Sequence, residues 1–84
     1  MKLVITEPAE KDIARLDEIT RRRIFLALEK MVINKRMVDL KKLKGNVDLW
    51  RLRAGDWRVI LQITGQEPTA YILRIKHRRE AYKR

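Results

Sequence analysis

The apolar residues of this chain change their spacing at Gly45, and this change limits the folds that the sequence can adopt. Before Gly45 they recur at the intervals of one helix face, as at Ile24, Leu28 and Met31. After Gly45 they tend to alternate with polar residues, as at 48–53. Helical spacing followed by alternation predicts helices first and strands afterwards. This order is typical of an α+β domain in which helices cover one face of an antiparallel sheet.

We expect a short N-terminal strand, a helix hairpin and three further strands, in that order. The N-terminal strand, 3–5, is followed by Pro8, whose missing N–H costs nothing at the first position of a helix. Thr20 is the predicted N-cap of the second helix, and the short connection between the helices favours an antiparallel helix hairpin. The remaining segments are a connector at 34–45, strands at 48–53, 57–63 and 70–75, and a short basic tail at 77–84.

Length and composition favour a single domain spanning residues 1–84. The chain lacks cysteine, which excludes disulfides and Cys-based zinc or redox sites. Its single histidine argues against a metal site built from protein ligands. No apolar run is long enough for a membrane span, and the N-terminus lacks the apolar segment of a signal peptide. We therefore expect a cytoplasmic protein without a cofactor.

The chain is strongly basic. It has 21 Lys and Arg residues against 11 Asp and Glu, which gives a net charge of +10, whereas a small domain commonly carries about 2–8. Such an excess favours a polyanionic partner, such as RNA, DNA or the ribosome, or an acidic protein. Residues 51–84 carry 9 basic and 3 acidic residues. An anion site is therefore expected in the strands and the tail.

A two-residue turn at 54–55 places several arginines on one face of the first hairpin. In this register Arg53 pairs with Asp56, and Arg51 lies directly opposite Arg58. Like charges that face each other destabilise a sheet, and an anion bound between them relieves the repulsion. Two alternatives stay open: long side chains that splay into water, and a bulge that shifts the register by one residue.

The other face of this hairpin is apolar and is expected to lie beneath the helices. It carries Trp50, Leu52, Trp57, Val59, Leu61 and Ile63. Tryptophans at alternating strand positions also suit the stacking of bases, but in this apolar company both are expected to be core residues.

The second hairpin and the tail are expected to extend the arginine site. A looser loop between these strands places Ile75 next to Arg58, and His77 one step farther on the same face. His77, Arg78 and Arg79 then approach the arginines of the first hairpin from the end of the strand.

These residue types suit the cleavage of a phosphodiester. A guanidinium group binds phosphate oxygens as a bidentate fork and stays charged. Such groups can stabilise the extra negative charge of a pentacoordinate transition state, and His77 or Tyr82 can exchange the proton. RNA carries its own nucleophile, the 2′-OH, so neither a metal nor a protein nucleophile is required.

Four short motifs occur together: Leu-Lys-Gly at 43–45, Trp-Arg-Leu-Arg at 50–53, Asp-Trp-Arg-Val at 56–59 and His-Arg-Arg-Glu-Ala-Tyr at 77–82. In this combination the chain resembles the RelE/ParE superfamily of bacterial and archaeal toxins. The resemblance covers essentially the whole chain, and the last motif favours the RelE-like members.

The resemblance implies the toxin of a toxin–antitoxin pair with a RelE-like fold. Such a toxin is an endoribonuclease, or mRNA interferase, which cuts mRNA in the ribosomal A site without a metal, inhibits translation and is neutralised by a cognate antitoxin. Its implied partners are the ribosome, mRNA and the antitoxin.

The matching positions also imply roles for individual residues. The catalytic set is Arg51, Arg58, Arg78 and Tyr82, and the predicted RNA contacts are Lys44 and Arg53, with His77 and Arg79 added from their place in the tail. The tail spacing leaves Lys76 and Arg79 open as alternatives to Arg78.

Two other functions remain open from the sequence. The first is a ParE-like inhibitor of DNA gyrase, which binds a protein target and cuts no RNA. The second is a nucleic-acid-binding protein without catalytic activity, whose affinity falls with salt as phosphate contacts require.

Overall fold

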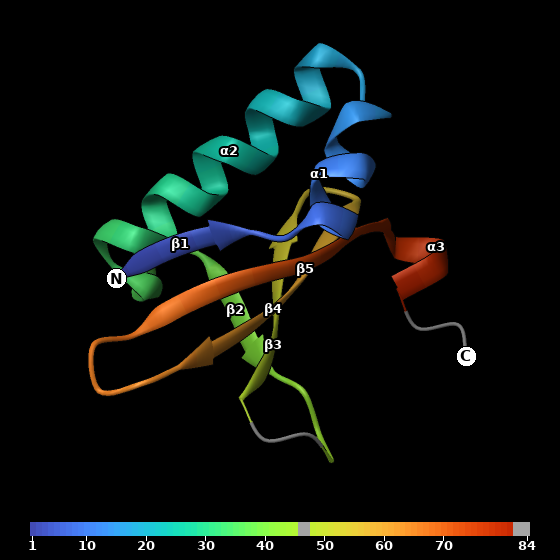
Figure 1. Cartoon of the computed structure of the whole chain (residues 1–84). Coiled ribbons are helices and arrows are strands. Elements are labelled where there is room, and N and C mark those ends of the chain that lie inside the picture. The colour runs from blue at the N-terminus through green and yellow to red at the C-terminus, as the bar shows by residue number, and fades with distance from the viewer. Residues whose placement is uncertain (46–47, 82–84) are drawn as a thin grey trace.

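The computed structural model describes residues 1–45 and 48–81. Its strands are β1 (Lys2–Ile5), β2 (Asp39–Lys42), β3 (Leu49–Ala54), β4 (Trp57–Thr64) and β5 (Thr69–His77). Its helical segments are α1 (Glu7–Ala14), α2 (Glu18–Ile33), the short 3-10 helix η1 (Lys35–Met37) and α3 (Arg78–Ala81). The strands form one sheet in the order β1-β5-β4-β3-β2 within the described chain (Figure 1). β1 runs parallel to β5, and the other neighbouring strands are antiparallel.

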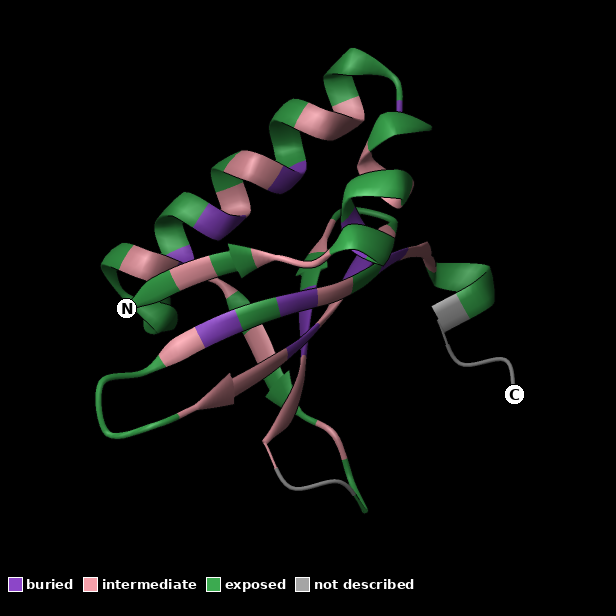
Figure 2. Ribbon diagram, in the orientation of Figure 1, coloured by how far each residue is buried: buried purple, intermediate pink, exposed green. Residues whose placement is uncertain are grey.

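The helices α1 and α2 cover one face of this sheet, and the core lies between the two layers (Figures 1 and 2). The buried apolar residues are Ala9, Leu16, Ile24, Leu28 and Met31 from the helical layer and Leu52, Val59, Leu61, Ala70, Ile72 and Ile75 from the sheet. Trp50, Trp57 and Ile63 pack against them. The predicted α+β class and the apolar face of the first hairpin are therefore confirmed. In the part of the chain that is described, no helix has the length and apolar character needed to cross a membrane.

Strand β2 lies inside the predicted connector 34–45 and is not apparent from the sequence. Its residues contain a single apolar side chain, Leu40, so they show no apolar alternation. β2 pairs with β3 at the edge of the sheet. Short, charged strands are typical of such edges, where they discourage pairing with another chain. The strand is therefore held mainly by its backbone pairing with β3.

The second helix begins earlier than predicted, because its N-cap is Asp17 and not Thr20. The Asp17 carboxylate accepts a hydrogen bond from the backbone N–H of Thr20 at 3.4 Å. This bond holds the pKa of Asp17 below its ordinary value. Both Asp and Thr suit an N-cap, so the sequence offers two possible starts, and α2 takes the first.

The turn between β3 and β4 is Gly55-Asp56, one residue later than predicted. Ala54 pairs with Trp57, and Gly55 has a φ of +61° at the first central position. A type II′ turn requires a positive φ at that position, which glycine adopts without strain and alanine does not. The later turn moves each cross-strand partner by two residues but leaves every side chain on its predicted face.

Strand β5 contains a bulge that the predicted register lacks. Leu61 lies opposite Ile72, but Ile60 lies opposite Arg74, so Leu73 is an extra residue on β5. A bulge of this kind reverses the face on which the following residues lie, relative to a regular strand. The second half of β5 is therefore turned over, which changes the residues that flank Arg58.

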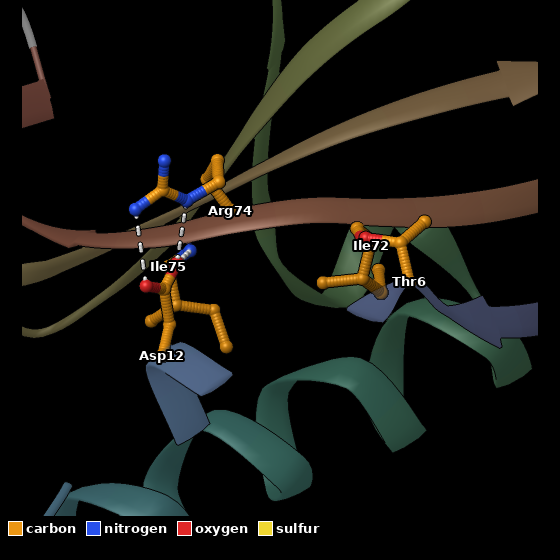
Figure 3. A network of polar contacts seen from close by, with 5 residues as sticks. All are labelled: Thr6, Asp12, Ile72, Arg74 and Ile75. Atoms are coloured by element: carbon orange, nitrogen blue, oxygen red, sulfur yellow. Dashed lines mark hydrogen bonds and ion pairs between the residues drawn. The ribbon is translucent and has the colours of Figure 1, made fainter. Parts of the chain in front are cut away.

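The Asp12 carboxylate of α1 binds β5 immediately after the bulge (Figure 3). It accepts a hydrogen bond from the Ile75 N–H at 2.8 Å and two from the Arg74 guanidinium, at 2.8 Å from Nε and 3.1 Å from Nη2. Burial raises the pKa of Asp12, but the hydrogen bonds from Arg74 and Ile75 outweigh it, so the pKa lies below its ordinary value. The ionised form of Asp12 therefore stabilises the fold.

Replacing Asp12 with asparagine should flatten the acid side of the stability profile. Because folding lowers the pKa of Asp12 below its ordinary value of 3.8, its contribution is complete above that value and is lost as the pH falls further. Asp12→Asn should therefore lower the free energy of unfolding by about 1–3 kcal/mol near neutral pH, with a loss that shrinks in acid. Urea unfolding over a pH series measures this. Glu10→Gln removes an exposed carboxylate of the same helix, and its free energy of unfolding should vary with pH as that of the wild type does. If the free energy of unfolding of Asp12→Asn also varied with pH as in the wild type, the prediction would be contradicted.

Candidate functional site

Three cationic side chains stand side by side across β3, β4 and β5. Arg53 lies directly opposite Arg58, and Arg58 lies directly opposite Lys76. Each of them is next in the chain to a residue of the core under the helices. Because successive side chains of a strand point to opposite faces, all three lie on the face away from the helices. We call Arg53, Arg58 and Lys76 the cationic row.

Arg58 is the central and most buried member of the row, with 7% of its surface exposed. Its Nη1 donates hydrogen bonds to the carbonyls of Gly55 at 2.9 Å and Trp57 at 3.1 Å. Its Nε is buried and has no hydrogen-bond partner among the described residues. An unpartnered buried donor is uncommon and costs about 1–3 kcal/mol.

Arg51 lies on the same face as Arg58, as predicted, but not opposite it. Its partner on β4 is Ile60, because the turn lies one residue later than predicted. The predicted pairing of Arg51 with Arg58 is therefore wrong, and Arg53 forms the like-charged pair with Arg58. Arg51 is also buried, and its Nη2 donates to the Asp39 carboxylate at 3.4 Å.

The members of the cationic row have no ion-pair partner in the part of the chain that the structure describes. By contrast, Arg51 pairs with Asp39 and Arg74 with Asp12. Cations directly opposite one another destabilise a sheet. An oxyanion that bridges them removes the repulsion and accepts charge-assisted hydrogen bonds. The arrangement therefore suits a phosphate group better than a neutral ligand.

The tail begins beside the turn that binds Arg58. The Arg78 N–H donates to the Asp56 carbonyl at 2.7 Å, and the Arg78 Nη1 lies 3.9 Å from the Asp56 carboxylate. The structure thus attaches Arg58 and Arg78 to the same two-residue turn. Arg79 is exposed, and its N–H donates to Nδ1 of His77 at 3.3 Å.

His77 does not lie where the sequence predicts. Beyond the bulge His77 pairs with Trp57, and Lys76 rather than Ile75 lies beside Arg58. The imidazole packs edge-on against the Trp57 indole, with ring centroids 5.3 Å apart, on the side that the helices cover. The prediction that His77 shares a face with Arg58 is therefore wrong.

The burial pattern of β5 explains why Lys76 lies beside Arg58. The buried residues of β5 are Ala70, Ile72 and Ile75, so their spacing increases from two residues to three. This irregular spacing requires an extra residue if all three side chains are to face the helices. A bulge, and with it a place for Lys76 beside Arg58, follows from that pattern.

Two predicted site residues lie apart from the cationic row or outside the described chain. Lys44 is exposed beyond the end of β2, near the start of β3, whereas the row lies at the other end of that strand. Tyr82 lies outside the described residues. No cluster of His, Asp and Glu side chains that could hold a metal ion occurs in the part of the chain that the structure describes.

Comparison with known proteins gives the family. The model of the family described as the ParE toxin of the type II toxin–antitoxin system parDE matches residues 3–82. The chain belongs to this toxin family. The resemblance to RelE/ParE toxins is therefore confirmed.

Relatives of this RelE/ParE toxin match it over nearly their whole length. Toxin RelE3 of Methanocaldococcus jannaschii is 29% identical over 86 residues, which cover 98% of this chain and 96% of that protein. A chain of the RelB–RelE antitoxin–toxin complex of Methanococcus jannaschii superposes with a TM-score of 0.76 at 25% identity, covering 95% of both chains. For the RelE–RelB complex of Pyrococcus horikoshii the TM-score is 0.75 at 27% identity, covering 95% of this chain and 97% of that one. The toxin thus has the RelE-like fold.

Repulsion within the cationic row predicts a measurable effect on the stability of this toxin. Lys76→Gln removes one cation and should raise the free energy of unfolding by roughly 0.2–1 kcal/mol at low salt. Inorganic phosphate should stabilise the wild type more than the variant, because the variant lacks part of the anion site. Urea unfolding with and without phosphate measures both effects.

Lys11→Gln is the matched control for this experiment. It causes the same change in net charge at an exposed lysine of α1, which pairs with Glu7 at 3.5 Å. Its response to phosphate should equal that of the wild type. Equal responses in the Lys11→Gln and Lys76→Gln proteins would show that the row is not the anion site.

Proposed function

We propose that this toxin is a ribosome-dependent endoribonuclease that cleaves mRNA in the A site and so inhibits translation in the cytoplasm. The observation that carries the proposal is the cationic row, in which Arg58 stands between Arg53 and Lys76 and none of the three has an ion-pair partner among the described residues. Neighbouring cations of this kind suit a bound phosphate group. The likeness to a protein named Toxin RelE3 over nearly the whole chain supports a RelE-like toxin.

In the proposed reaction the RNA supplies the nucleophile. The 2′-oxygen attacks the adjacent phosphorus and loses its proton to a base, while the bond from phosphorus to the 5′-oxygen breaks and that oxygen gains a proton. The products are a 2′,3′-cyclic phosphate and a 5′-hydroxyl. The cationic row holds the non-bridging oxygens and stabilises the charge that they gain in the transition state. No metal is needed for this chemistry.

Other cations surround the row in this proposal. Arg51 lies on the same face of β3 as Arg53, and Arg78 lies at the turn that binds Arg58. Both are therefore suited to phosphates next to the scissile one or to the leaving group. Tyr82 is proposed as the general base, because the tail is rich in cations, and cations favour the phenolate form that can accept the proton.

The remaining predicted RNA contacts lie away from the scissile phosphate. His77 packs against Trp57 on the other side of the sheet, and Lys44 is exposed beyond the end of β2, near the start of β3. We propose that Lys44, His77 and Arg79 bind RNA backbone outside the cleavage site, where each adds affinity but no rate.

Programmed ribosomes test the proposed reaction directly. Wild-type toxin should cut the message in the A site and leave a 2′,3′-cyclic phosphate. Arg58→Ala should lower the single-turnover rate by about 100–1,000-fold, because it removes a donor to the transition-state oxyanion. Lys76→Ala should also lower the rate, by about tenfold or more. Mapping and chemical analysis of the fragment ends measure these outcomes.

Two controls sharpen this assay. A message with a 2′-deoxy nucleotide at the scissile position should resist cleavage, because it lacks the nucleophile. Lys11→Gln, on the helical side, should cut as the wild type does. An intact message with wild-type toxin, or equal cleavage by Arg58→Ala, would refute the proposed function.

An inhibitor of DNA gyrase is the second candidate function. The observation in its favour is that the matching family model is described as a ParE toxin. A supercoiling assay with purified gyrase separates the two, since poisoning of gyrase together with intact messages would favour this candidate. Salt-dependent binding of RNA with neither activity would instead indicate a nucleic-acid-binding protein without catalysis.

We also propose a cognate antitoxin, acidic or amphipathic, that covers the face bearing the cationic row. The net charge of +10 and the ion-pair-free row among the described residues favour an acidic partner. The matching structures from both archaea are complexes of RelE with RelB. A purified complex should lose the stabilisation by phosphate that the free toxin shows. An undiminished response to phosphate would place the antitoxin elsewhere.

A further inference from the structure

We propose that Asp12 is a positioning residue for the cationic row, acting from the opposite side of the sheet through the bulge in β5. Its effect on cleavage rests on the proposed function, whereas its effect on strand register does not. Asp12 lies on α1, in the layer that covers the sheet. Its carboxylate binds Arg74 and the Ile75 N–H of β5, and its charge also acts on Lys76 of the row.

The bulge decides which side chain stands beside Arg58. Without the extra residue at Leu73, the pairing that begins near the β4–β5 loop would continue and place Ile75 next to Arg58. With the bulge, Lys76 takes that place, and Ile75, 4% exposed, turns into the core. Since a shift of one residue moves every following side chain to the other face, the row has its third cation only in the bulged register.

The outer edge of β5 lacks a strand partner at the point where the bulge occurs. β1 pairs with β5 only as far as Ile5 and Ile72. Thr6 adds the last backbone bond, from its N–H to the Ile72 carbonyl at 3.1 Å, after which the chain turns into α1. The Ile75 N–H beyond this point therefore needs another acceptor, and the Asp12 carboxylate supplies it at 2.8 Å.

Core packing and the Asp12 contact stabilise the bulge in different ways. Burial of Ile75 favours the bulged register over the regular one, but it leaves the Ile75 N–H without an acceptor. A buried N–H without a partner carries a penalty, which a local loosening of the strand relieves by admitting water. Loosening of the residues after the bulge would also move Lys76, which directly follows Ile75. Asp12 prevents this movement.

Asp12 also controls the position of Arg74, the other cation in this part of β5. Arg74 lies opposite Ile60, two residues along each strand from the pair formed by Lys76 and Arg58. Its guanidinium is bound by both Asp12 oxygens. The carboxylate thereby holds Arg74 against α1 and keeps it from competing with Lys76 for the same phosphate.

Nuclear magnetic resonance of the free toxin tests the register without any assumption about activity. In Asp12→Ala, the cross-strand contacts between Arg58 and Lys76 should weaken, and the Ile75 amide should exchange with solvent at least tenfold faster. The contacts on the loop side of the bulge, between Gln62 and Tyr71, should stay as in wild type. Unchanged contacts and exchange after the bulge would overturn the inference.

Single-turnover cleavage on programmed ribosomes tests the consequence for the site. Asp12→Ala should lower the maximal rate by about 10–100-fold, because a small displacement of a group at the reacting centre has effects of this size. The concentration for half-maximal rate should change less than about threefold, since the exposed cations still bind RNA. Asp12→Asn keeps an oxygen that accepts from Ile75 and should recover most of the rate.

Thr6→Val is the matched control for stability. It removes a 2.6 Å hydrogen bond from the Thr6 hydroxyl to the Ile72 carbonyl, on the same strand but before the bulge. It should lower the free energy of unfolding and leave the maximal cleavage rate unchanged. A rate loss equal to that of Asp12→Ala would show that both variants act only through stability, which would overturn the inference.

The outcomes separate this inference from the proposed function. If the wild type cuts no message, the nuclease proposal fails and the register measurements still decide the role of Asp12. If Asp12→Ala does not fold, Asp12→Asn takes its place, and the cleavage rate of Asp12→Asn should then fall only as far as its Ile75 exchange becomes faster than in wild type. A large rate loss in Asp12→Asn with unchanged exchange would overturn the inference.

Discussion

The rest of the site depends on how the buried Arg58 side chain is held by hydrogen bonds. β4 is buried on both faces, with Val59 directed to the helices and Arg58 to the other side. A buried charge is tolerated only with polar partners, and Arg58 finds two of them in the carbonyls of Gly55 and Trp57. The turn at Gly55 therefore joins the two strands of the hairpin and also supplies a hydrogen-bond acceptor for the arginine. Because the tail binds the same turn through Asp56, this turn fixes the position of the tail as well as that of Arg58.

The fold class and the division of the first hairpin into an apolar and a basic face can be predicted from the sequence. Both follow from side-chain alternation, because an error of two residues in the pairing leaves every side chain on the same face. The partner of Arg58 cannot be predicted in the same way, because it depends on whether the turn is 54–55 or 55–56. Glycine decides this choice through its positive φ, and a rule that places glycine first in the turn would have given Arg53 as the partner.

The position of Lys76 and the strand β2 were harder to predict, for two different physical reasons. Lys76 reaches the row through a bulge that is stabilised by Asp12, a residue far away in the sequence, whereas Tyr71, Leu73 and Ile75 alternate as in a regular strand. β2 has no apolar alternation because an edge strand needs little of it. Local patterns report side-chain burial well, but they say little about backbone groups whose partners come from distant segments.

The parallel pairing of β1 with β5 has a consequence for how the protein folds during its synthesis. The hydroxyl of Thr6 bonds to a residue 66 positions later, so the N-terminal strand emerges from the ribosome long before its partner exists. Contacts between such distant segments form late in folding. Lys76 belongs to β5, the last strand to be made. A nascent chain therefore carries Arg53 and Arg58 before it carries Lys76. The cationic row is complete only once β5 has been made, so a partly translated chain lacks the finished site.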